Sequence, residues 1–199
     1  VLPGEDAFIK GVRKICDEKD LLFIVDEVQC GLGRTGKLFA YQHYGVEPDI
    51  MTLAKALGGG APIGAMLAKE KVAAGFKPGD HASTFGGNPL VTAAGVAALN
   101  VILEEDLVHN AEVMGEYLMC KLEGLKKKFN FIKEIRGKGL LLGMECAKEV
   151  SGIIEACLEK GLLLINAGPN VLRFIPPLNI TFEQVDRSAV ILEEALAAS

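Results

Sequence analysis

The sequence contains no tryptophan, only three histidines, and no two cysteines in a CxxC spacing. Its five cysteines are an odd number without a regular spacing, which argues against a disulfide framework, and the histidines lie too far apart to indicate a zinc site. We therefore expect no metal centre, and reduced thiols that pack as small apolar side chains.

Long apolar runs and clusters of positive charge are also scarce. No apolar stretch reaches the roughly 18 residues that a membrane helix needs. The net charge is −5, and the only basic cluster is residues 126–128. That charge is too small to attract a polyanion. We expect a cytoplasmic protein that binds neither membranes nor nucleic acid.

The composition is that of a globular protein. Half of the 199 residues are apolar and 24% are charged, which predicts one or two domains. The spacing of apolar residues predicts helices over 7–19, 89–129 with a break near 104–106, 151–160 and 181–198. Short apolar runs predict strands at 21–25, 50–54, 131–135, 140–144, 162–165 and 171–175. This order of elements indicates an α/β fold.

Charged residues follow the first two predicted strands. Leu21–Val25 is a continuous apolar run, typical of a parallel strand covered on both faces, and it ends at Asp26. Lys55 follows the second strand. The separation of Asp26 and Lys55 is about that of one strand–crossover–strand unit. Because ligands bind at the carboxyl ends of strands in open α/β sheets, we expect both side chains at one ligand-binding edge.

A glycine-rich segment between these strands allows a first interpretation, nucleotide binding. Gly31, Gly33 and Gly36 match GxGxxG, and residues 31–37 match GxxxxGK. However, Leu38 stands where a magnesium-binding serine or threonine is required, and the preceding acids would repel a phosphate. A second interpretation is purely structural: the glycines form a turn, the acids cap an element, and the lysine is solvated.

A third interpretation joins Lys55 and Asp26 in one reaction. Pyridoxal phosphate chemistry needs two such groups. One is a lysine amine that forms an imine with the cofactor aldehyde, and the other is an aspartate that keeps the pyridine nitrogen protonated. Lys55 stands between an apolar strand and a glycine triplet, so we expect its amine in a partly desolvated place. A hydroxyl near a helix start, such as Thr84, suits the cofactor phosphate.

Five segments together resemble the class III pyridoxal-phosphate aminotransferases. They are Val25–Gln29, Gly31–Gly36, Pro48–Ile50, Ala54–Gly60 and Thr84–Leu90. The resemblance covers the whole chain and implies fold type I, the aspartate aminotransferase-like α/β fold. It implies that residues 1–98 are the latter part of the large, mostly parallel-sheet domain, and that residues 99–199 are the small carboxyl-terminal domain.

The resemblance also implies roles for individual residues. Lys55 matches the lysine that forms the Schiff base, and Asp26 matches the partner of the pyridine nitrogen. Val28 would pack on the cofactor ring, with Gln29 near the ring's phenolic oxygen.

Three further residues match positions nearer the phosphate and the substrate. Thr84 matches the residue that reaches the phosphate of the neighbouring subunit's cofactor, and Ser83 would lie beside the substrate. Arg173 matches the arginine that binds the substrate α-carboxylate, a bidentate task suited to guanidinium. From spacing alone, Arg173 is also consistent with a surface arginine at a strand edge, and Ser83 with ordinary capping.

Segments 36–41, 164–169 and 173–178 are most similar to family members that act on N-acetylornithine. The implied reaction is exchange of an amino group between N-acetylornithine and 2-oxoglutarate in arginine biosynthesis, in a homodimer with shared active sites. Succinylornithine, ornithine and 4-aminobutyrate are alternative substrates. The resemblance further implies that this is a carboxyl-terminal half, inactive alone. A non-catalytic domain that assembles with a second chain is the alternative of another class.

Overall fold

The computed structural model describes residues 1–199, which divide into two compact units. One unit comprises Gly4–Val108, and the other comprises His109–Ser199 together with Val1–Pro3. The domain boundary expected at residue 98 lies inside helix α3 (Pro89–Glu104), whereas the units divide after Val108. None of the helices is both long and apolar enough to cross a membrane.

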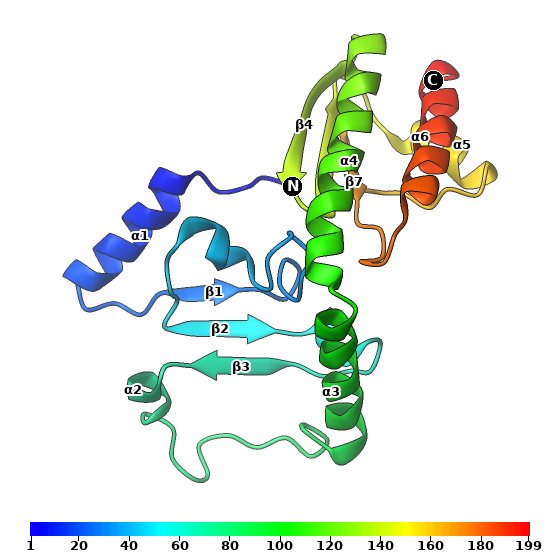
Figure 1. Cartoon of the computed structure of the whole chain (residues 1–199). Coiled ribbons are helices and arrows are strands. Elements are labelled where there is room, and N and C mark those ends of the chain that lie inside the picture. Colours follow the sequence, from blue (N-terminus) through cyan, green and yellow to red (C-terminus); the bar gives the residue numbers. More distant parts are fainter. The chain divides into compact units, whose positions relative to one another are not determined.

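The first unit contains one sheet together with α-helices and 3-10 helices (Figure 1). In chain order its elements are α1 (Asp6–Glu18), β1 (Ile24–Asp26), the 3-10 helix η1 (Ala40–Tyr44), β2 (Ile50–Leu53), the 3-10 helix η2 (Lys55–Gly58), β3 (Ala65–Ala68), α2 (Glu70–Ala73) and α3. Helix α3 begins as predicted: Pro89 is its first residue, and the Asn88 side chain caps it by accepting from two backbone N–H groups.

The sheet of the first unit has the strand order β1-β2-β3. Strands β1 and β2 are parallel, with Ile24 opposite Ile50 and Asp26 opposite Thr52, which confirms the predicted parallel pair. Strand β3 is antiparallel to β2 and was not predicted, because its Ala-Met-Leu-Ala sequence lacks the β-branched and aromatic residues typical of strands. The carboxyl ends of β1 and β2 therefore lie at the same edge of the sheet (Figure 1).

The prediction that the first strand is covered on both faces was wrong. The strand begins at Ile24 rather than at Leu21, and the side chains of Leu21, Leu22 and Ile24 are 55%, 54% and 58% exposed. The physical reason is that β1 is an edge strand of a three-stranded sheet, and no second layer of this chain covers these residues.

The second unit packs helices on an antiparallel sheet of order β4-β5-β7-β6. Its elements are α4 (Leu107–Lys128, whose first two residues belong to the other unit), β4 (Ile132–Lys138), β5 (Leu141–Cys146), α5 (Ser151–Glu159), β6 (Ile165–Asn166), β7 (Val171–Phe174) and α6 (Phe182–Ala197). The helix break predicted near 104–106 is confirmed, since α3 ends at Glu104 and α4 begins at Leu107. Of the strand predicted over 162–165, only Ile165 lies in a strand, because β6 consists of Ile165 and Asn166.

The core of the second unit is formed by apolar side chains from both layers. Leu122, Leu140, Leu142, Met144 and Leu172 are at most 1% exposed. The expectation that every cysteine packs as a buried apolar side chain was wrong for Cys120, which lies on the exposed side of α4. An amphipathic helix leaves such positions in solvent.

Candidate active site at the carboxyl ends of the parallel strands

The structure brings a lysine and an amide together at the carboxyl edge of the parallel strands. Asp26 is the last residue of β1, and Lys55 lies two residues beyond Leu53, the last residue of β2. The Lys55 Nζ atom donates a hydrogen bond of 2.6 Å to Oε1 of Gln29, which lies in the turn after β1. Residues predicted from two separate motifs thus meet where the parallel topology places them.

The backbone at Lys55 has an unusual conformation. Lys55 has a φ of +49°, in the left-handed region, at the first position of η2. That region costs an L-residue other than glycine about 1–2 kcal/mol, and such strain concentrates at functional sites. The expectation of a partly desolvated amine is not met in this chain, because Lys55 is exposed. Its covering would have to come from groups outside the described residues.

The Asp26 carboxylate is oriented by its own turn. Its Oδ1 atom accepts a hydrogen bond of 2.9 Å from the backbone N–H of Val28, a local arrangement typical of aspartate in turns. The other carboxylate oxygen has no hydrogen-bond partner in the chain, and the residue is exposed. One side of this carboxylate is fixed, and the other is available to a cationic N–H donor.

Glu27, the residue after Asp26, is a buried anchor that sequence reasoning recognised only as an unspecified cap. Its side chain is 3% exposed and accepts hydrogen bonds of 2.9 Å from the backbone N–H groups of Ala40 and Tyr41 at the start of η1. The Cys30 thiol donates to the same carboxylate at 3.3 Å. Burial, reinforced by the Glu27 charge, raises the pKa of Cys30 to about 12, so this thiol stays protonated.

The glycine-rich loop is engaged in its own hydrogen bonds. The N–H of Gly31 donates to the Glu27 carbonyl, that of Gly33 to the Leu38 carbonyl, and that of Gly36 to the Gly33 carbonyl. A phosphate-binding loop directs such N–H groups toward its ligand instead. The loop is therefore a structural turn, and the geometry gives no support to the nucleotide interpretation.

The predicted phosphate and substrate hydroxyls lie in an exposed segment before α3. Ser83 Oγ accepts a hydrogen bond of 3.0 Å from the N–H of Gly86, which is an ordinary local turn contact. Thr84 is exposed, and no hydrogen bond joins either residue to the Lys55–Gln29 pair.

Arg173 belongs to the second unit and is not at a sheet edge. It lies on β7, with Gly143 of β5 opposite it on one side and Ile165 of β6 on the other. Its Nε atom is buried and has no hydrogen-bond partner. An unpaired buried guanidinium nitrogen is costly, and a carboxylate is the group best suited to satisfy it. The strand-edge interpretation of Arg173 is therefore wrong.

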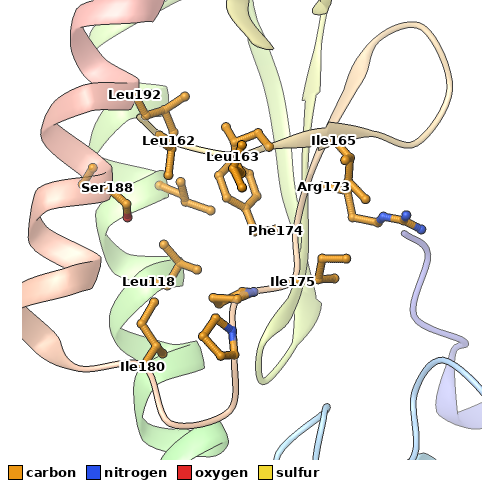
Figure 2. Close-up of a pocket in the computed structure, with 15 residues that line it drawn as sticks. Leu118, Leu162, Leu163, Ile165, Arg173, Phe174, Ile175, Ile180, Ser188 and Leu192 are labelled. Atoms are coloured by element: carbon orange, nitrogen blue, oxygen red, sulfur yellow. The ribbon is translucent and has the colours of Figure 1, made fainter. Parts of the chain in front are cut away.

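A cavity of about 360 Å³ lies in the second unit beside Arg173 (Figure 2). Leucine, isoleucine, phenylalanine and proline side chains line most of it, and Arg173 is its only charged lining residue. Figure 2 shows the Arg173 side chain extending away from the apolar residues. No acid or base lines this cavity, and its one hydroxyl, that of Ser188, donates a hydrogen bond to the Val185 carbonyl. The lysine and the carboxylate that the chemistry needs are those at the strand ends of the first unit.

The side chains at the strand ends fit pyridoxal phosphate. A primary amine is available for the aldehyde, and a carboxylate with one free oxygen is available for the pyridinium N–H. The amide of Gln29, whose oxygen accepts a hydrogen bond from that amine, is a polar group that could also hold the cofactor's phenolic oxygen.

Comparisons with known proteins agree with this chemistry. The model of the family "Aminotransferase class-III" matches residues 1–196. The acetylornithine aminotransferase of Caldanaerobacter subterraneus is 58% identical over 96% of this chain and 48% of its own length. The succinylornithine transaminase of Photorhabdus laumondii is 48% identical over 98% of this chain and 50% of its own length.

A solved structure reported for redox regulation of Plasmodium falciparum ornithine delta-aminotransferase superimposes with a TM-score of 0.94 at 41% identity. The superposition covers 100% of this chain and 51% of the chain in that structure. The predicted fold type I is thereby confirmed. This chain spans about half the length of the relatives it matches. It belongs to the class III aminotransferase family, whose members use pyridoxal phosphate.

Proposed function

We propose that this chain provides the cofactor-binding lysine and the proton-transferring groups of an aminotransferase that exchanges an amino group between N-acetylornithine and 2-oxoglutarate. The observation that carries the proposal is the meeting of Lys55 and Gln29 beside Asp26 at the ends of two parallel strands. In this proposal residues 1–98 are the latter part of the large domain, and residues 99–199 are the small domain.

Pyridoxal phosphate, when bound, supplies an aldehyde that condenses with amines and a protonated ring that accepts electrons. Lys55 would hold the cofactor through its amine. In the reaction the Lys55 Nζ atom would serve as the general base that takes a proton from the substrate Cα and as the general acid that returns it. The same group would serve the amino donor and the oxo acid in two half-reactions.

Three residues at the end of β1 would hold the ring. The Asp26 carboxylate would favour a protonated pyridine nitrogen through its free oxygen, because an adjacent negative charge favours the protonated form. Val28, two residues beyond Asp26, would pack on the ring. The Gln29 amide, which accepts a hydrogen bond from the Lys55 amine, would bind the phenolic oxygen.

Substrate and phosphate contacts come from the remaining predicted residues. Arg173 binds the substrate α-carboxylate with a guanidinium whose Nε atom has no partner within this chain. Ser83 lies beside the substrate. Thr84, exposed and without a hydrogen bond in its own chain, reaches the cofactor phosphate of a second subunit in a homodimer.

N-Acetylornithine is the proposed amino donor because a relative that is 58% identical carries that substrate in its name. Succinylornithine is the second candidate, since a relative that is 48% identical is named for it. The two donors differ only in the acyl group. Comparing kcat/KM for the two, with ornithine as a third donor, decides between them.

The first test is covalent trapping of the cofactor. The protein is mixed with pyridoxal phosphate and reduced with borohydride, and the added mass is located by peptide mass spectrometry. We expect selective labelling of Lys55, and no labelling of that peptide in Lys55→Arg. Exposed Lys71 serves as the matched control, because Lys71→Arg should label at Lys55 as the unaltered protein does.

Two results would contradict the proposal. Equal labelling of exposed lysines without preference for Lys55 would contradict the assignment of the cofactor site to Lys55. Transamination by Lys55→Ala at the rate of the unaltered protein would contradict the proton-transfer role of Lys55. Either result, together with a stable complex with a second polypeptide in size-exclusion chromatography, would favour the non-catalytic alternative.

A further inference from the structure

Glu27 is the only buried charged residue of the chain, and its place next to Asp26 calls for an explanation. Its side chain is 3% exposed, and Thr35 is the only other buried polar residue. Burying a carboxylate is costly unless its oxygens receive hydrogen bonds. A carboxylate in such a position has a specific structural task.

The hydrogen bonds of Glu27 connect two elements that are distant in sequence. Its Oε2 atom accepts from the N–H of Ala40 and from the thiol of Cys30, and its Oε1 atom accepts from the N–H of Tyr41. The backbone N–H of Glu27 donates to the Thr52 carbonyl of β2. One residue therefore joins the end of β1, the start of η1 and the neighbouring strand.

The same residue closes the turn that carries Gln29. The N–H of Gly31 donates to the Glu27 carbonyl at 2.9 Å, and the Cys30 thiol approaches the Asp26 carbonyl at 3.4 Å. A Cβ atom on Gly31 would lie 2.8 Å from the Glu27 carbonyl oxygen, so the turn closes this tightly only with glycine there. Gln29 stands in the middle of this turn, between two fixed ends.

We propose that Glu27 is a positioning residue: its buried carboxylate fixes the turn of residues 27–31 against η1 and so holds the Gln29 amide at the Lys55 amine. This inference rests on the proposed function for its catalytic meaning. No hydrogen bond joins Glu27 to Lys55, so Glu27 acts through Gln29.

Glu27→Gln is the sharpest perturbation, because it preserves the size of the side chain. A glutamine has one acceptor oxygen and one NH2 group, so its NH2 would face a backbone N–H of Ala40 or Tyr41, donor against donor. A buried donor without a partner loosens the attachment to η1. Glu47→Gln is the matched control in the same unit, because Glu47 is exposed.

The experiment is a double-mutant cycle on the reactivity of Lys55, which needs no cofactor. The full-length protein carrying this sequence is treated with trace acetic anhydride, and acetylation of Lys55 relative to Lys71 is measured by mass spectrometry. The temperature is kept well below the unfolding transition. We expect Glu27→Gln to raise the ratio about 10-fold, as for loss of one hydrogen bond to a charged group. Gln29→Ala should raise the ratio equally, and the double variant should show no further increase.

Several outcomes overturn the inference. They are an unchanged ratio in Glu27→Gln, a change of the same size in Glu47→Gln, or additive effects of Glu27→Gln and Gln29→Ala.

If Glu27→Gln does not fold, Ala40→Pro removes one of the two backbone N–H donors to Glu27 instead. Proline suits this first helical position, and Phe39 before it is extended. Ala40→Pro should raise the ratio in the same direction, and an unchanged ratio again contradicts the inference. Trapping of pyridoxal phosphate at Lys55 tests the proposed function separately, so either idea can fail alone.

Discussion

Replacing Asp49 with asparagine should destabilise the first unit by an amount that disappears in acid. Asp49 directly precedes β2 and accepts hydrogen bonds from the Phe23 N–H at 2.8 Å and from the Arg13 guanidinium at 2.7 Å. Lys69 lies 3.3 Å from its other oxygen. The Arg13 and Asp49 side chains are only 15% and 14% exposed, so solvent screens the pair weakly. Asp49 thus connects α1, the residue before β1, the start of β2 and the residue after β3.

The magnitude follows from proton linkage. The Phe23 N–H, then Arg13 and Lys69, lower the pKa of Asp49 from its ordinary 3.8 to about 2. Because the pKa is lower in the folded state, the carboxylate stabilises the fold above the unfolded pKa, and this contribution is lost as the pH falls through the folded pKa. The contribution at neutral pH is about 2 kcal/mol. Asp49→Asn should lose about that amount at pH 7, and the difference from the unaltered protein should shrink between pH 4 and pH 2.

Urea unfolding followed by pulsed hydrogen exchange and mass spectrometry measures this effect one unit at a time. The absence of tryptophan makes peptide resolution necessary. Peptides from residues 21–53 report the first unit, and peptides from 132–146 report the second, which should not respond. Asp20→Asn is the control, because Asp20 is exposed and asparagine tolerates its φ of +52°. A loss of the same size at pH 2 as at pH 7, or an equal loss in Asp20→Asn, would refute the linkage argument.

Three substitutions, two of them paired with a control variant, test the second unit by urea unfolding. Leu122→Ala should cost about 2–5 kcal/mol, because the side chain is fully buried, and a cost under about 1 kcal/mol would contradict that packing. Gly115→Ala should cost about 1–3 kcal/mol, since its Cβ would lie 2.4 Å from the Gly139 backbone, whereas Gly124→Ala in the same helix meets nothing within 4 Å and should be neutral or stabilising. Equal effects of the two glycine changes would disprove the close approach. Thr181→Ala should cost about 1 kcal/mol through loss of the capping box, and Thr181→Ser should restore most of it. An unchanged midpoint in Thr181→Ala would show that the cap is dispensable.

The local order of the elements was determined by the sequence. Asn88-Pro89 marks the start of α3, and Thr181 with Gln184 marks the start of α6, because side-chain caps and a proline act over three or four residues without tertiary help. The apolar runs that end at Asp26 and Lys55 likewise predict two parallel strands and place both residues at one edge, since the topology of a crossover unit leaves no other arrangement.

Three features of the structure depend on tertiary contacts and could not be predicted from local sequence patterns: the burial of Glu27, the position of Arg173 and the exposure of the residues around β1. The burial of Glu27 depends on backbone N–H groups more than ten residues away, so its sequence neighbourhood gives no hint of it. The position of Arg173 inside the sheet depends on β6, a strand of two residues that sequence patterns cannot delimit. Exposure of the residues around β1 depends on whether a second layer covers the sheet. An apolar run indicates only that its side chains favour burial. Whether a second layer covers them depends on the assembled fold, so the exposure of these residues could not be predicted from the run itself.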